Sequence, residues 1–103
     1  MRHLLAQGMR ILDTNWRCRL GEIDIVATDG DCLVVCEVKT RRGSAFGTPA
    51  EAVTPRKLGR LRRLAAAWLT EHEGGYGQLR IDIVGVSRPP RGPCRIEHLR
   101  AVG

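Results

Sequence analysis

The chain has 103 residues, 43% of them hydrophobic and 27% charged, which is typical of one globular domain that buries its own core. No apolar run approaches the roughly 20 residues of a membrane span, and the first ten residues are too weakly apolar for a secretory signal. The four cysteines lack the spacing of a zinc site or a disulfide scaffold. We therefore expect a cytoplasmic protein with no membrane partner.

Basic residues outnumber acidic ones, 17 to 11, and give a net charge of +6. The segment from Lys39 to Arg63 is especially basic, because Glu51 is its single acid. Such a concentration of positive charge favours a polyanionic partner. A cationic face that is only solvated is the alternative.

The first 40 residues predict a short helix and then three strands, at 1–7, 9–19, 22–28 and 32–40. Gly8 provides a helix C-cap, and residues 13–15 interrupt the first strand with turn-forming side chains. The second and third strands are joined by Asp29-Gly30-Asp31, which is a strong hairpin signal.

The rest of the chain predicts one long helix and two strands. Thr54-Pro55 starts the helix, which runs to about His72 before Gly74-Gly75. An earlier start signal lies at 48–53, where Glu51 completes a capping box. The strands cover 78–86 and, at a sheet edge, 94–102. A strand–helix–strand crossover then gives a parallel pair, so we expect an α/β fold whose mixed central sheet is flanked by helices.

Carboxylates in the middle of the predicted hairpin raise the question of function. Side chains alternate along a strand, so Glu22 and Asp24 share one face, and Glu37 shares a face with Lys39. An Asp29-Gly30 loop sets Asp24 opposite Val35, whereas a Gly30-Asp31 loop sets it opposite Glu37. Both place the two carboxylates on one face, directly or diagonally paired. A three-residue loop without a bulge would separate them.

Two neighbouring carboxylates repel each other unless a cation compensates them. Magnesium suits such oxygen ligands and keeps waters that bridge to phosphate. Lys39 would then lie beside the metal, where its ammonium orients water or stabilises developing phosphoryl charge. A structural network of ion pairs among Asp24, Glu37 and Lys39 is the alternative.

Asp24 followed by Glu37-x-Lys39 on the next strand resembles the PD-(D/E)XK nuclease superfamily. More narrowly, "GEIDIVATDGDCLVVCEVKTRRG", "GTPAEAVTPRKLGRLRRLAAAWL" and "RIDIVGV" resemble the YraN-like family, itself similar to archaeal Holliday-junction resolvases. The match runs from about Leu4 to Val86. It implies a single domain over residues 1–103 with a restriction-endonuclease-like α-β-β-β-α-β core.

The resemblance implies a DNA endonuclease that hydrolyses phosphodiesters with Mg²⁺ or Mn²⁺, with branched or flapped DNA as the candidate substrate. Asp24, Glu37 and the backbone carbonyl of Val38 would hold the metal, and Lys39 would assist the attacking water. Relatives have a longer first helix carrying a metal-directed glutamate, so the helix here is expected to be truncated, with Glu22 as a substitute. The sheet surface left uncovered would favour a homodimer.

Further residues have both structural and functional interpretations. Glu51 is a capping-box acid or a metal-site residue. Lys57 falls within the apolar arc of the long helix, where it either reaches Glu37 or keeps its head in water. Asp82 pairs with an arginine or supports the metal site indirectly. The remaining arc is a core stripe: Leu58, Leu61, Leu64, Ala65, Trp68 and Leu69.

The basic residues expected to contact nucleic acid are Arg41, Arg42, Arg56, Arg60 and Arg63. Two other functions remain open on the sequence. The first is a non-catalytic nucleic-acid-binding module with a decayed metal site. The second is an assembly domain whose basic face meets an acidic protein.

Overall fold

A computed structural model describes the backbone of residues 2–42, 53–72 and 74–102, and all their side chains except those of Arg41 and Arg42. In these ranges the chain forms two helices and five strands. They are α1 (Arg2–Ala6), β1 (Arg10–Cys18), β2 (Gly21–Asp29), β3 (Cys32–Arg42), α2 (Pro55–Glu71), β4 (Gln78–Arg88) and β5 (Arg95–Leu99). The predicted order of elements is confirmed.

The five strands form one mixed sheet in the order β1-β2-β3-β4-β5. Only β3 and β4 are parallel, and α2 makes the crossover between them; the other neighbours are antiparallel. The α/β prediction is confirmed in this form, with the β2–β3 hairpin inside the sheet and β5 at an edge.

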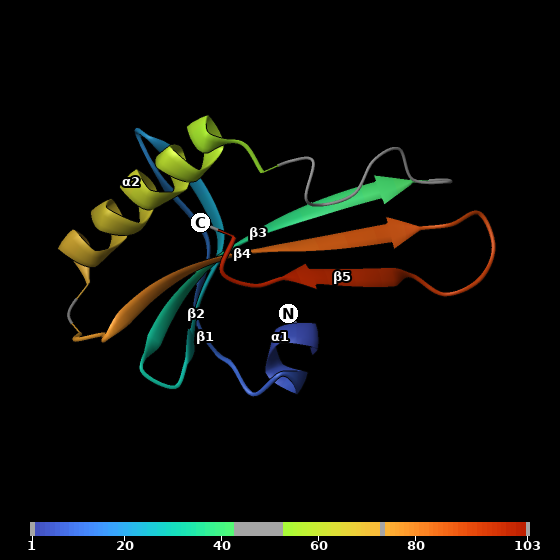
Figure 1. The fold of residues 1–103 in the computed structure, drawn as a ribbon, viewed down its shortest axis with the longest axis horizontal. Coiled ribbons are helices and arrows are strands. Elements are labelled where there is room, and N and C mark those ends of the chain that lie inside the picture. Colours follow the sequence, from blue (N-terminus) through green and yellow to red (C-terminus); the bar gives the residue numbers. More distant parts are fainter. Residues whose placement is uncertain (1, 43–52, 73, 103) are drawn as a thin grey trace.

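The two helices cover opposite faces of the sheet (Figure 1). On one face α2 packs its buried residues against Ile23, Val26 and Val35. On the other face Leu4 of α1 packs against a cluster that includes Ile25 and Cys36. The sheet is therefore the shared middle layer, and any residue on β3 or β4 belongs to one helix face or the other.

Helix α2 begins as its sequence predicts. Thr54 has an extended backbone, and its hydroxyl oxygen accepts the Lys57 N–H at 3.2 Å, while Pro55 occupies the first turn. These features fix the first turn over the sheet. Trp68 is 3% exposed, so its predicted core position is confirmed. Leu69 is exposed instead of buried, because the helix buries a narrower stripe than the sequence arc indicates.

The hairpin uses the Gly30-Asp31 loop. Asp29 pairs with Cys32, and Gly30 has φ 59°, a conformation that favours glycine. This confirms the second of the two predicted registers, in which Asp24 faces the Glu37 position. The regular backbone pairing of the two strands ends at Ile25↔Cys36, which is one residue pair before Asp24 and Glu37.

Alternation along β2 fails around Asp24. Ile23 and Val26 both pack on the α2 face, although strict alternation would separate them. The neighbouring strand β1 carries a bulge between Ile11 and Asp13, and Asn15 has φ 50°. The predicted interruption at 13–15 is therefore accommodated inside one strand. Strict alternation would also place Glu22 and Val26 on one face, but this irregularity turns the strand and separates them.

Candidate functional site

Asp24 lies where β2 and β3 stop pairing regularly. Its Oδ2 accepts the backbone N–H of Val38 at 2.8 Å, so a side chain takes over a contact that a strand backbone would otherwise make. The carboxylate is thereby held beside the Glu37–Lys39 segment. Asp24 also lines an open hollow of about 340 Å³ together with Thr14, Asn15 and Val38. The site is consequently reachable from solvent.

Glu37 points to the α2 face and is mostly buried. Its Oε2 lies 2.9 Å from Nζ of Lys57, with side-chain exposures of 14% and 17%. The same oxygen has no well-aligned hydrogen bond from any described residue. The contact is thus an ion pair between point charges, and the buried carboxylate is incompletely satisfied. The predicted reach of Lys57 to Glu37 is confirmed.

Lys39 lies within interaction distance of the same groups. The neighbouring Lys57 ammonium and then burial lower the pKa of Lys39, and the negative charges of Glu37 and Asp24 only partly counteract them. Asp24, Glu37, Lys39 and Lys57, here termed the Glu37 cluster, are therefore gathered in one place. Three of these side chains come from β2 and β3, and Lys57 comes from α2.

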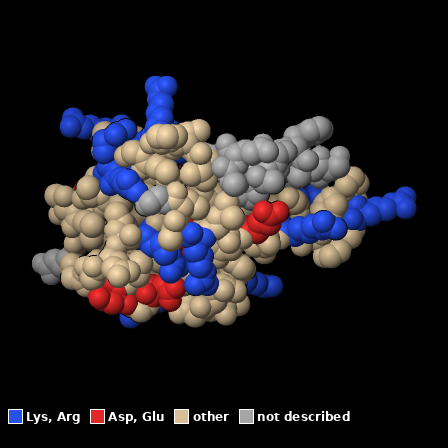
Figure 2. Space-filling model, viewed as in Figure 1, with Lys and Arg blue, Asp and Glu red and all other residues tan. Residues whose placement is uncertain are grey.

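A basic hollow adjoins the Glu37 cluster at the start of α2. Its volume is about 400 Å³, and its lining residues are Thr54, Arg56, Lys57, Arg60 and Arg63. The three arginines are exposed, and Figure 2 shows Lys and Arg side chains gathered over α2. Lys57 belongs both to this hollow and to the ion pair with Glu37. The hollow has the charge and openness that suit phosphate groups.

Other predicted residues lie apart from the Glu37 cluster. Glu22 forms a 2.8 Å surface ion pair with Arg17 on β1. Arg41 and Arg42 extend the β3–β4 pairing to Arg88, but their side chains lie outside the described residues. Glu51 also lies outside the described residues. The structure therefore brings together Asp24, Glu37, Lys39 and Lys57, and it does not place Glu22 among them.

Asp82 lies on the opposite face of the sheet from Glu37. It pairs in register with Cys36, which packs on the α1 side, and it is 0% exposed. Arg80 donates from Nε to Oδ1 at 2.9 Å and from Nη2 to Oδ2 at 3.0 Å. The predicted pairing of Asp82 with an arginine is confirmed.

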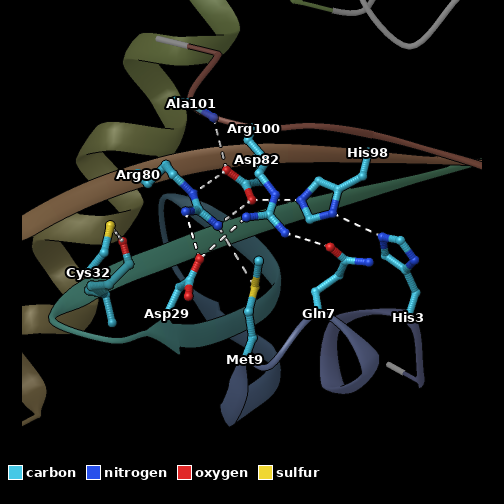
Figure 3. Close-up of polar contacts among 11 residues, drawn as sticks. His3, Gln7, Met9, Asp29, Cys32, Arg80, Asp82, His98, Arg100 and Ala101 are labelled. Atoms are coloured by element: carbon cyan, nitrogen blue, oxygen red, sulfur yellow. Dashed lines mark hydrogen bonds and ion pairs between the residues drawn. The ribbon is translucent and has the colours of Figure 1, made fainter.

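Two further contacts complete the surroundings of Asp82 (Figure 3). His98 Nε2 lies 2.7 Å from Oδ2, and the N–H of Ala101 donates to Oδ1 at 3.1 Å. His98 Nδ1 in turn lies 3.0 Å from Nε2 of His3 on α1. We term these residues, with Arg80, the Asp82 cluster. It joins α1, β4, β5 and the segment after β5.

Sequence reasoning missed the histidines of the Asp82 cluster. His3 and His98 are 95 positions apart, so spacing offers no signal of their contact. Burial, followed by the charge of His98, lowers the pKa of His3. The alternating Arg80-x-Asp82 pair was the one available sequence signal, because residues two apart share a strand face.

The donor set available to a metal at the Glu37 cluster consists of two carboxylates. Within residues 2–42, 53–72 and 74–102, no three His, Cys, Asp or Glu side chains group in a way that would hold a metal ion. Two carboxylates with a backbone carbonyl nevertheless match magnesium, which retains several waters. The incompletely satisfied Oε2 of Glu37 also fits such a ligand.

Neither described helix is long and apolar enough to cross a membrane. A UPF0102 protein of Frankia alni is 62% identical over 99 residues, covering 96% of this chain and 82% of the relative. One of Streptomyces coelicolor is 60% identical over 103 residues, covering 98% and 79%. One of Kineococcus radiotolerans is 57% identical over 103 residues, covering 99% and 84%.

Residues 1–86 also match the model of the uncharacterised protein family UPF0102. This match includes every residue of the Glu37 cluster and the whole basic hollow. With the relatives above, it confirms the YraN-like membership that the sequence motifs predicted. The chain therefore belongs to the UPF0102 family.

Proposed function

We propose that this protein is a DNA endonuclease that depends on Mg²⁺ or Mn²⁺ and hydrolyses phosphodiesters in the cytoplasm. The observation that carries the proposal is the gathering of Asp24, Glu37 and Lys39 beside a basic hollow. An acid pair with a lysine supplies metal ligands and a cation, and the hollow supplies phosphate contacts. We further propose that residues 1–103 form one domain with a restriction-endonuclease-like core.

Asp24, Glu37 and the backbone carbonyl of Val38 would hold the metal. Such an ion, when bound, neutralises phosphate charge and makes water a better nucleophile. The chain's own residues then have separate roles. The Val38 N–H holds the Asp24 carboxylate in place. Glu37 and Lys39 are alternate residues of β3 and share one face of the strand. Both are partly buried, so the lysine charge acts at short range with little screening by water.

Hydrolysis joins a water oxygen to phosphorus and breaks one phosphorus–oxygen ester bond. Lys39 is placed to orient that water or to stabilise the negative charge that grows on the phosphoryl oxygens. Arg56, Arg60 and Arg63 are exposed along the hollow and would hold flanking phosphates. Their guanidinium groups suit bidentate phosphate contacts, which position the backbone without reading its sequence.

The substrate to test first is branched or flapped DNA, which the resemblance to resolvases implies. A homodimer is part of the same proposal, because Leu5 and Ile96 leave apolar surface exposed near α1 and β5. We propose that Arg41 and Arg42 also contact nucleic acid. We propose supporting roles for Glu51 and Asp82.

A cleavage screen tests the proposal. Purified protein is incubated with junction, flap, single-stranded and duplex DNA in Mg²⁺ or Mn²⁺, beside an Asp24→Asn, Glu37→Gln double variant. We expect metal-dependent cleavage of at least one DNA, and a loss of at least about a hundredfold in the double variant. The matched control is Glu22→Gln, which removes a carboxylate from the same strand outside the cluster and is expected to retain activity.

Two outcomes would contradict a nuclease. One is no cleavage of any of the four DNAs with either metal. The other is cleavage that the double variant retains, which would point to a contaminating enzyme. DNA binding that survives chelation and the Asp24→Asn change would instead support a non-catalytic binding module.

A further inference from the structure

Lys57 takes part in two neighbouring features at once. Its Nζ lies 2.9 Å from Oε2 of Glu37, and the same residue lines the basic hollow with Arg56, Arg60 and Arg63. Its backbone is fixed, because its N–H donates to the Thr54 hydroxyl in the first turn of α2. Only the flexible side chain is therefore free to exchange one partner for another.

The chain uses lysine only at this place. Of its 17 basic residues, two are lysines, Lys39 and Lys57, and both lie at Glu37. Arginine holds a carboxylate through a planar fork, whereas lysine is a point charge on a long, flexible stem. Glu37 Oε2 has no aligned hydrogen bond within the described residues. The ion pair consequently lacks the directional bonds that would hold Lys57 in place.

A divalent metal at Glu37 would approach the carboxylate whose Oε2 already faces the ammonium of Lys57. Both are cations, and two cations within a few ångströms at a mostly buried carboxylate repel strongly. A metal that ligated Oε2 of Glu37 would therefore displace the Lys57 ammonium from that oxygen. The basic hollow is the nearest place where the side chain remains in a polar setting, and a bound phosphate there would provide a new anionic partner.

We propose that Lys57 is a built-in cation that holds Glu37 before metal binding and moves to a DNA phosphate when the metal binds. This inference rests on the proposed function and adds a coupling to it. DNA draws Lys57 away from Glu37 and so raises the affinity for metal. By linkage, the metal raises the affinity for DNA by the same factor.

The first test is calorimetric titration of Mn²⁺ into DNA-free protein. Wild type is compared with Lys57→Met, which keeps the stem and removes the charge, and with Lys57→Gln as a second variant in case the first fails to fold. We expect both variants to bind Mn²⁺ about tenfold more tightly than wild type, because no cation needs to be displaced. Arg60→Met is the matched control from the same hollow, and its Mn²⁺ affinity should stay within about twofold of wild type.

The second test measures coupling by fluorescence anisotropy of a labelled duplex, with Ca²⁺ as a hard oxygen-seeking cation. We expect Ca²⁺ to raise the DNA affinity of wild type at least about fivefold. Lys57→Met should lose this gain. Arg60→Met should bind DNA more weakly at all Ca²⁺ concentrations yet keep the gain, because it removes a phosphate contact only.

The outcomes separate this inference from the proposed function. Mn²⁺ binding that needs Glu37 but is unchanged or weakened in both Lys57 variants overturns the inference and leaves the nuclease proposal intact. Absence of Mn²⁺ binding in wild type and in both variants overturns the two together. Tighter binding in the Lys57 variants, with the Ca²⁺ gain lost, supports the inference.

Discussion

Two polar clusters on opposite faces of one sheet differ in how completely their carboxylates are satisfied. In the Asp82 cluster, both oxygens of a carboxylate with 0% exposure have close partners, from Arg80, His98 and the Ala101 N–H. In the Glu37 cluster, a carboxylate of 14% exposure has an oxygen with a nearby lysine and no aligned hydrogen bond from the residues that the structure describes. The clusters occupy neighbouring strands.

This difference separates a structural role from a functional one. A buried polar network whose members are all satisfied fixes one arrangement of the elements that supply them. An incomplete network retains bonding capacity that a ligand can use, and it costs stability until the ligand arrives. The Asp82 cluster holds α1 and the C-terminal segment on the sheet. The Glu37 cluster keeps such bonding capacity at Oε2 of Glu37, as far as the described part of the chain shows.

The largest effect should follow from Asp82→Asn. The amide presents donor hydrogens to Arg80 or His98, so a buried donor faces another donor. We expect the free energy of unfolding to fall by about 3 kcal/mol or more, measured by urea denaturation. Asp31→Asn, at an exposed position in the hairpin loop, should change stability by less than about 0.5 kcal/mol. Equal losses in the two variants would refute the structural role.

Glu37→Gln should have a smaller effect on stability. Among the described residues no aligned hydrogen bond to its Oε2 would be lost, and Lys57 lines the adjoining hollow into which its side chain can turn. We expect a loss of about 1 kcal/mol or less in the same urea measurement. Mn²⁺ affinity, in contrast, should fall at least about tenfold. A stability loss as large as that of Asp82→Asn would show that the Glu37 cluster is structural as well.

The smallest effect concerns Cys36, which lies in sequence beside Glu37 and pairs in register with Asp82. Burial, followed by the charge of Asp82, raises the pKa of the Cys36 thiol from 9.0 to about 12. The raised pKa means that the neutral thiol adds to the free energy of unfolding. This contribution is present in full below pH 9.0 and is lost as the pH rises toward 12.

At pH 8 we expect iodoacetamide to alkylate the exposed Cys94 and to leave Cys36 unmodified, as read by peptide mass spectrometry. Asp82→Asn should increase the modification of Cys36 by loosening the packing around it. Equal alkylation of Cys36 and Cys94 in wild type would contradict the burial argument.

Short-range signals predicted most of the fold. The Thr54-Pro55 start of α2, the Gly30-Asp31 loop and the strand–helix–strand crossover are all local patterns, and each is present. The proximity of Asp24, Glu37 and Lys39 followed from hairpin register, because period-two alternation holds along β3. Even the reach of Lys57 followed from its place on the helical wheel.

The remaining features depend on tertiary contacts that periodicity does not encode. Alternation failed at Glu22 because β2 turns at Asp24, where a side chain replaces regular strand pairing. Leu69 lies on the predicted apolar arc, but the sheet beneath α2 covers less of the helix than the arc spans. The His3–His98 contact joins residues near the two chain ends, and one sequence carries no pattern for such a pair.

The position of Asp82 has a consequence for the order in which the protein assembles during synthesis. Its partners His98 and Ala101 follow 16 and 19 residues later in the chain, so they are synthesised after Asp82, whereas its partner Arg80 precedes it. His3 lies 95 positions before His98, so it is synthesised long before this partner. The hairpin and α2 can pack earlier from local contacts. Docking of α1 should therefore be a late event, completed only after the last strand is free.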